Sequence, residues 1–116
     1  MARVYESDGY WAGLLAGGLS KLMVLRALYE GPGHGYALVR RIDIMTNGFC
    51  ASSQAGVYSA LREFERTGCV CHRIDAHGRR LSKVYELTPK GRKALAAGLA
   101  AWERALPAMR KAVGIR

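Results

Sequence analysis

The side chains best suited to specific chemistry lie in one short segment, from Ser52 to Gly68. Val57, Leu61 and Phe64 follow one another at i, i+4 and i+7, which predicts a helix with one buried apolar face. Ser53 is placed to cap its first turn, and Gly68 to end it. The opposite face carries donors and acceptors suited to base edges and phosphates. The segment therefore predicts a helix that reads nucleic acid, although an ordinary amphipathic helix with a solvated polar face has the same pattern.

A basic turn follows this segment. Residues 69–74 and 83–87 alternate with a period of two and flank a turn from Asp75 to Arg80, which predicts a β-hairpin with Gly78 at its centre. A solvated basic loop is one interpretation, and a wing beside a phosphate backbone is the other. Together with the helix, the hairpin gives a set of expected DNA contacts: Ser53, Gln54, Tyr58, Ser59, Arg62, Arg79, Arg80 and Lys83.

Cys69 and Cys71 form the other group of reactive side chains, with Cys50 closer to the N-terminus. Two residues apart on a regular strand, their side chains would share a face at about 6.6 Å. That separation is wide for a disulfide, but a soft metal or arsenite could bridge the thiols if the strand bends, with help from Cys50 or His72. Cysteine is also a common small buried residue, and this structural role is the preferred interpretation.

No catalytic constellation stands out. His34, His72 and His77 lie in different segments, and no Ser, His and Asp grouping has a recognisable context. The glycines do not form a phosphate-binding loop of the P-loop type. The sequence predicts a protein that is not an enzyme and that needs no cofactor.

Composition points to a polyanionic partner. The 116 residues suit one small domain, and a formal net charge of +9 suits nucleic acid or an anionic membrane surface. The longest apolar run, Tyr10 to Leu19, contains three glycines and falls short of the roughly 18–20 residues of a spanning helix. An odd number of cysteines fits a reducing compartment, and acidic Glu6 and Asp8 do not fit a secretory signal. We expect a cytoplasmic protein that is not inserted in a membrane.

The remaining segments must position these side chains. Residues 1–9 are expected to be flexible or weakly docked, and 10–19 to be helical only with a partner surface, because each glycine costs a helix roughly 1 kcal/mol. Apolar stripes predict helices over Leu19–Glu30 and His34–Met45, each followed by glycine-containing turn signals. Three helices followed by a hairpin predict a mainly α fold, a winged helix-turn-helix over residues 19–88.

Residues 89–116 predict a last helix. Thr88 is expected to cap it and Pro89 to occupy its first position. Pro107 is expected to bend the helix between Glu103 and Pro107. Apolar residues with heptad-like spacing form a seam along this helix: Leu95, Leu99, Trp102, Leu106, Met109 and Val113.

Together these segments resemble the PadR family of winged-helix transcriptional regulators. Gly33-His34-Gly35-Tyr36 is similar to the family's signature at the start of the second helix, and Tyr58 to Gly68 to its recognition-helix pattern. Gly78-Arg79-Arg80, with Tyr85 to Gly91, looks like its wing tip, second wing strand and start of the final helix. The resemblance covers residues 19–95 but not 1–18. Ala55-Gly56 and Cys69 depart from the family pattern, so no base preference is carried over.

The resemblance implies a homodimer, held by the helix of residues 89–116, that binds double-stranded operator DNA. It also implies a repressor of phenolic-acid detoxification, drug efflux or developmental genes, released by a small hydrophobic or aromatic effector. Residues 1–18 are expected to dock on the dimer. PadR-like drug regulators use an aromatic pair for planar or cationic ligands, which suggests an effector site here: Trp102, Leu99, Leu106 and Trp11.

Alternatives remain open at this stage. Trp102 could pack only against the partner's first helix or the Tyr10–Trp11 segment. The protein could instead be a repressor that responds to thiol chemistry or a soft metal through Cys69 and Cys71. It could also be a winged-helix module that serves mainly protein association, in which case its basic charge is a general property and not a DNA-binding feature.

Overall fold

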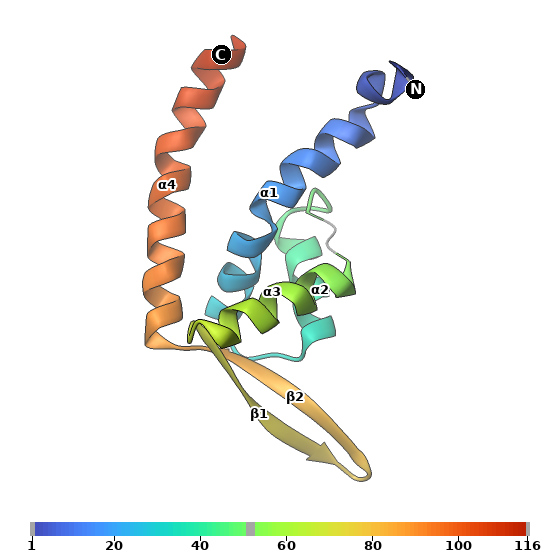
Figure 1. Cartoon of the computed structure of the whole chain (residues 1–116), viewed down its shortest axis with the longest axis vertical. Helices are drawn as coiled ribbons and strands as arrows, with labels where there is room; N and C mark the ends of the chain where they lie inside the picture. The colour runs from blue at the N-terminus through green and yellow to red at the C-terminus, as the bar shows by residue number, and fades with distance from the viewer. Residues whose placement is uncertain (1, 51–52, 116) are drawn as a thin grey trace.

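The computed structural model describes residues 2–50 and 53–115, so Ser52 of the predicted recognition segment lies outside the described residues. Three helices pack together, a two-stranded hairpin projects from them, and a long last helix rises beside the first (Figure 1). Both ends of the chain lie at the same end of the molecule, opposite the hairpin. The elements in chain order are η1 (Ala2–Glu6), α1 (Asp8–Tyr29), α2 (Gly35–Met45), α3 (Gln54–Arg66), β1 (Val70–His77), β2 (Arg80–Leu87) and α4 (Pro89–Val113).

The core forms where the second half of α1 meets α2, α3 and the base of the hairpin. Its largest fully buried side chains come from all three helices, namely Val24, Leu38, Ile42, Val57 and Leu61. Since Val57 and Leu61 are buried as the period of α3 predicted, α3 packs with its polar face outward. The prediction of a mainly α, winged helix-turn-helix fold is confirmed.

α1 differs from its prediction. It is one helix of 22 residues that continues through all its glycines, so the division between residues 18 and 19 falls inside a single element. Its second half contributes Val24, Leu25 and Leu28 to the core. Helix growth from an established turn is far easier than nucleation, and no proline interrupts the segment. The packed second half therefore extends into the glycine-rich first half.

α1 is a longer apolar segment than the run from Tyr10 to Leu19 that the sequence pattern delimited. By length and composition alone, Asp8–Tyr29 is sufficiently long and apolar to span a bilayer. The same test is passed by core helices, and the second half of α1 is such a helix. Its first half instead exposes Trp11, Leu14 and Leu15.

Residues before α1 are more ordered than expected. η1 is a short 3-10 helix, and the indole Nε1 of Trp11 donates a 2.8 Å hydrogen bond to the carbonyl oxygen of Tyr5. The rings of Tyr5, Tyr10 and Trp11 pack on one another with centroid distances of 5.0 to 6.2 Å. Aromatic stacking therefore holds the described part of the N-terminal segment against the start of α1.

The hairpin is longer than predicted. β1 and β2 each span 8 residues, and the antiparallel register runs from Val70 opposite Leu87 to His77 opposite Arg80. The turn is therefore only Gly78 and Arg79, whereas the sequence pattern predicted a turn from Asp75 to Arg80. Gly78 has φ of +62°, which suits the first central position of a type II′ turn. The outer part of the hairpin lacks a buried face, so its residues do not show the alternation that marks a half-buried strand.

α4 begins as predicted. Thr88 Oγ1 accepts a 3.0 Å hydrogen bond from the backbone N–H of Gly91, and Pro89 occupies the first helical position. The helix then runs for 25 residues and continues through Pro107. Proline leaves the carbonyl of Glu103 without its helical donor, which a solvated helix tolerates because water replaces it.

Candidate nucleic-acid interface

The two ends of α3 are fixed by local hydrogen bonds. Ser53 Oγ accepts a 3.0 Å bond from the N–H of Gly56, which confirms the predicted N-cap. At the other end, the N–H groups of Gly68 and Cys69 donate to the carbonyls of Glu65 and Phe64 at 3.1 and 2.8 Å. With Gly68 at φ of +82°, this is the Schellman arrangement. α3 is therefore a helix of defined length, and its polar face is held in one orientation.

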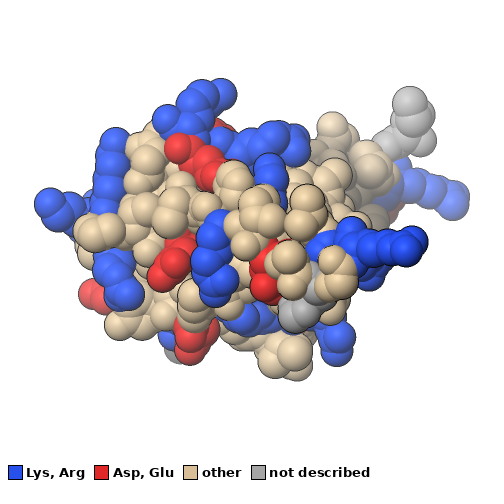
Figure 2. All heavy atoms as spheres, turned by 90° about the horizontal axis from the view of Figure 1, so that it is seen from below, with Lys and Arg blue, Asp and Glu red and all other residues tan. Residues whose placement is uncertain are grey.

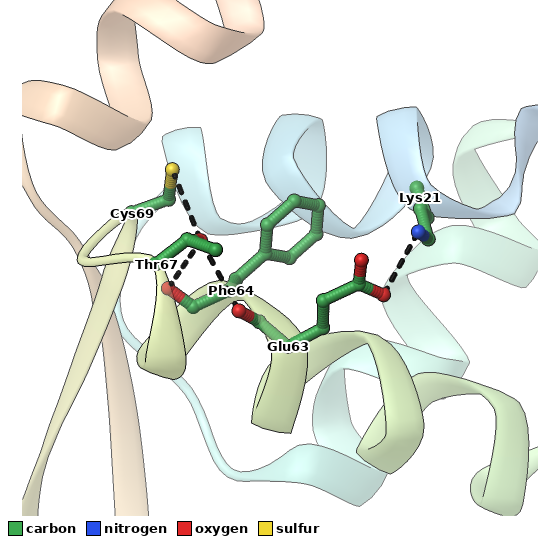
Figure 3. Close-up of polar contacts among 5 residues, drawn as sticks. All are labelled: Lys21, Glu63, Phe64, Thr67 and Cys69. Atoms are coloured by element: carbon green, nitrogen blue, oxygen red, sulfur yellow. Dashed lines mark hydrogen bonds and ion pairs between the residues drawn. The ribbon is translucent and has the colours of Figure 1, made fainter.

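Figure 3 shows the surroundings of this C-terminal end. The Thr67 hydroxyl lies 3.1 and 3.2 Å from the carbonyl oxygens of Glu63 and Phe64, and 3.8 Å from Cys69 Sγ. On the neighbouring turn, Lys21 Nζ of α1 lies 2.8 Å from Glu63 Oε2. The side-chain hydrogen bond and charge of Lys21 hold the pKa of Glu63 below its ordinary value. The Lys21–Glu63 pair therefore joins α3 to α1, while the Thr67 hydroxyl bonds the end of α3 itself.

Most of the predicted contact residues on α3 are exposed. Gln54, Ser59 and Arg62 face solvent, whereas Tyr58 is half-buried. Its ring lies against Gly35 at the start of α2, so closely that a Cβ at position 35 would be 2.3 Å from the ring. The space occupied by the Tyr58 ring therefore requires glycine at position 35. Tyr58 packs α3 on α2, which is a more structural position than the sequence suggested.

The hairpin carries its basic residues in the open. Arg79 lies in the turn, Arg80 begins β2, and Lys83 follows on the same strand, and all three are exposed. Figure 2 views the molecule from the hairpin end, with Lys and Arg side chains projecting around the rim and acidic side chains between them. A phosphate backbone approaching this face meets positive charge first.

Polar contacts at its base hold the hairpin on the helices. Gly33 and Tyr85 exchange backbone hydrogen bonds of 3.1 and 2.9 Å, so the chain before α2 adds a short bridge to the free edge of β2. His72 of β1 pairs with Glu65 of α3. His34 Nδ1 lies 3.2 Å from the carbonyl oxygen of Lys83. The base of the hairpin is therefore fixed to both α2 and α3, while its tip extends freely.

A recess lies between α2, α3 and β2, with a volume of about 300 Å³. Sequence reasoning missed it, because its walls come from three segments that are distant along the chain. Burial raises the pKa of Tyr85 in its wall above the ordinary 10.0, and the neighbouring Glu65 charge adds to this. The Tyr85 hydroxyl therefore stays protonated at neutral pH. The lining residues are His34, Gly35, Tyr36, Tyr58, Ser82, Lys83 and Tyr85.

The cysteines lie in different environments. Cys50 and Cys69 are buried, whereas Cys71 is exposed on β1. Cys69 precedes β1 and occupies the position after Gly68, where a helix ending of this kind usually places an apolar contact with Phe64. Across residues 2–50 and 53–115, no group of three or more His, Cys, Asp or Glu side chains could hold a metal ion. This geometry favours the structural interpretation of Cys69.

Trp102 lies between α1 and α4, half-buried against the core. On one side it lines an apolar groove of about 560 Å³, whose main walls are Leu15, Leu19, Leu22, Trp102, Leu106 and Met109. On the other side it lines a second hollow, of about 540 Å³, with Leu19, Met23, Phe49 and Cys50. Leu99 lies apart with Tyr29 and Arg92, and Trp11 packs with Tyr5 and Tyr10. Of the predicted effector residues, only Trp102 and Leu106 line the apolar groove.

A capped helix with an exposed polar face, packed on two others and followed by a two-stranded basic hairpin, defines a winged helix-turn-helix protein. The model of the transcriptional regulator PadR-like family matches residues 24–97, and the chain belongs to this family. The family and the solved structures similar to this chain are transcriptional regulators rather than enzymes. No curated protein sequence matches the chain.

Solved structures agree with this assignment. A PadR family regulator from Eggerthella lenta is 26% identical, with a TM-score of 0.74 and coverage of 85% of each chain. A transcriptional regulator from Clostridium thermocellum is 24% identical, with a TM-score of 0.74 and coverage of 81% of this chain and 89% of that one. Bacillus subtilis PadR, solved with operator DNA, is 23% identical, with a TM-score of 0.64, and the match covers 70% of this chain and 46% of that one.

Proposed function

We propose that this protein is a cytoplasmic transcriptional repressor that binds double-stranded operator DNA through α3 and the hairpin. One observation carries the proposal: the polar face of α3 is exposed, and the hairpin with the exposed arginines is fixed at its base to α2 and α3. Gln54, Ser59 and Arg62 are the proposed base-reading side chains. The operator complex of Bacillus subtilis PadR supports DNA as the partner of this fold.

The hairpin arginines provide a direct test. Each phosphate contact that is lost should flatten the dependence of log K on log salt by about 0.9, and weaken binding to all sequences alike. The double variant Arg79→Ala, Arg80→Ala should therefore lower affinity. It should also flatten the salt slope by nearly twice the value for one contact. Arg62→Ala should instead relax specificity at one base position. Unchanged affinity and slope in the double variant would disprove the wing assignment.

We propose a homodimer formed by α1 and α4. The first half of α1 and the outer half of α4 expose apolar side chains that one chain leaves uncovered, such as Leu14, Leu15, Leu106 and Met109. A two-fold dimer presents two copies of α3, so the operator should be palindromic, with half-site centres one turn of about 10 bp, or a multiple, apart. Sedimentation should give twice the chain mass. Footprinting that protects one asymmetric half-site at saturation would contradict the dimer.

A small aromatic or cationic effector is proposed to release the repressor from DNA by binding beside Trp102. Trp102 gives the apolar groove an aromatic wall beside the aliphatic side chain of Leu106, and indole attracts flat apolar and cationic groups. A ligand that alters the angle between subunits would change the spacing of the two α3 helices. The effector site and the DNA-binding surface are then coupled, because the dimer has one state that binds DNA and one that does not.

The variant Trp11→Phe leaves Trp102 as the sole indole, so the fluorescence of Trp102 tests whether the effector binds beside it. Planar dyes should quench its fluorescence at the concentration that releases DNA. Release without quenching, or a Trp102→Ala variant that stays dimeric and inducible, would assign the effector to another site.

A triple Cys→Ser variant serves as the control for thiol or metal sensing, and should respond to the effector like the unaltered protein. Gel shifts against competitor DNA separate operator binding from a role in protein association.

A further inference from the structure

The recess between α2, α3 and β2 is lined by polar side chains that the packing of these three elements does not require. Its lining brings together one lysine, Lys83, and three residues that carry hydroxyl groups, Tyr36, Tyr58 and Ser82. Tyr36 is 53% exposed, so its side chain is accessible to a ligand from solvent. Lys83 forms no ion pair among the described residues. A lysine amine and several hydroxyls facing one hollow form a set of donors for an anion.

The location of the recess indicates which anion. A recognition helix occupies a major groove, and a wing lies toward the neighbouring minor groove. The two grooves are separated by one sugar–phosphate strand. That strand must cross the protein between α3 and the hairpin, and the recess opens at this position, since Tyr58 belongs to α3 and Lys83 to β2.

We infer that this recess binds a phosphate of the DNA backbone, at the point where the strand passes from the groove read by α3 to the groove beside the hairpin. Lys83 supplies the charge, and the hydroxyls of Tyr36 and Tyr58 donate hydrogen bonds. This inference rests on the proposed function. It also changes the role of Tyr58, from base contact to phosphate contact, and adds Tyr36 and Ser82 to the interface.

The experiment begins with a duplex selected from a random-sequence pool by the full-length protein. If no sequence is enriched over random DNA, the proposed function itself fails, independently of the recess. With an enriched duplex, affinity is measured by fluorescence anisotropy against salt concentration for Lys83→Met, Tyr36→Phe and Tyr58→Phe. The matched controls are Lys93→Met and Tyr29→Phe, exposed residues of α4 and α1. Thermal unfolding checks that every variant folds.

Lys83→Met should flatten the salt slope by about 0.9. The contribution of one phosphate contact to the affinity falls with salt concentration to the power of about 0.9 and vanishes at 1 M. At 0.1 M salt its loss therefore lowers affinity about eightfold. Each tyrosine variant keeps its ring and loses only a donor to a charged acceptor, so affinity should fall about tenfold. Both controls should bind like the unaltered protein.

A scan with methylphosphonate duplexes, each lacking one phosphate charge, then locates the contact. The unaltered protein should lose most affinity at one phosphate in each half-site, and Lys83→Met should lose much less at that position. Wild-type affinity in both tyrosine variants would overturn the inference, even if Lys83→Met binds weakly. Equal losses of Lys83→Met and the unaltered protein at every phosphate would also overturn it.

Discussion

Replacing Gly35 by alanine tests how α2 and α3 fit together. The new Cβ would lie 2.3 Å from Cε1 and Cζ of the Tyr58 ring and 2.5 Å from its hydroxyl oxygen. Carbon atoms in ordinary contact are about 3.5–4.0 Å apart, so the ring must move by at least about 1 Å. Forced overpacking of this kind costs about 1–3 kcal/mol. Alanine recovers at most about 1 kcal/mol over glycine in a helix, and less in a first turn. We expect Gly35→Ala to destabilise the fold by about 1–2 kcal/mol.

The contact couples positions 35 and 58. In a Tyr58→Ala background the obstructing ring is gone, so Gly35→Ala should cost nothing or stabilise slightly. The coupling free energy between positions 35 and 58 should then be about 2 kcal/mol. Urea unfolding at one fixed protein concentration measures all four variants, which keeps any association equilibrium constant.

Gly18→Ala is the matched control for helical glycine. An added Cβ at position 18 has no neighbour within 4 Å, so alanine should be neutral or stabilising there. If Gly35→Ala costs the same in the unaltered protein and in the Tyr58→Ala variant, the contact is refuted. Gly35→Ala should also weaken DNA binding, because the displaced ring no longer lies in the recess.

Three further predictions concern stability and reactivity. Gly91→Ala should destabilise the fold by about 3 kcal/mol in urea unfolding. Its Cβ would lie 2.0 Å from the carbonyl oxygen of Cys69, which belongs to the backbone and cannot rotate away. A change below about 0.5 kcal/mol, the usual effect of a surface substitution, would contradict this prediction. Ser53→Ala should cost about 1 kcal/mol through loss of the N-cap, with Ser53→Asp as the variant that retains it. Burial raises the pKa of the Cys50 thiol above 9.0, so at pH 8 an aromatic disulfide reagent should modify exposed Cys71 first and Cys50 only on unfolding; equal rates would disprove the order.

Local signals in the sequence were sufficient for most of the fold. The caps at Ser53 and Thr88 were predicted because a capping side chain and its acceptor or donor lie within one turn of each other. The extent of α1 was not predicted, because propensity alone penalises its glycines, whereas the packed second half decides the helix. The hairpin turn was placed too early because solvated strands lack the alternation on which the prediction depended.

The candidate site divides in the same way. The exposed residues of α3 follow from its helical period and Arg79 follows from the turn signal at Gly78, so Gln54, Arg62 and Arg79 were predicted from the sequence. The recess did not follow, since Tyr36, Tyr58 and Lys83 meet only in the folded chain. The separation of Trp11 from Trp102 could not be foreseen either, because it depends on the divergence of α1 and α4 seen in Figure 1.

The joint between α3 and α4 has a mechanical consequence. Thr88 Oγ1 donates a 2.7 Å hydrogen bond to the carbonyl of Gly68, its N–H bonds the carbonyl of Cys69 at 3.1 Å, and Gly91 lies against that same carbonyl. The last turn of α3 and the first turn of α4 therefore rotate as one body. α4 has 25 residues, about 37 Å at helical rise, so a tilt of about 5° at the joint moves its far end by about 3 Å. Conversely, a displacement of a few ångströms at the far end of α4 is transmitted through this joint to the last turn of α3.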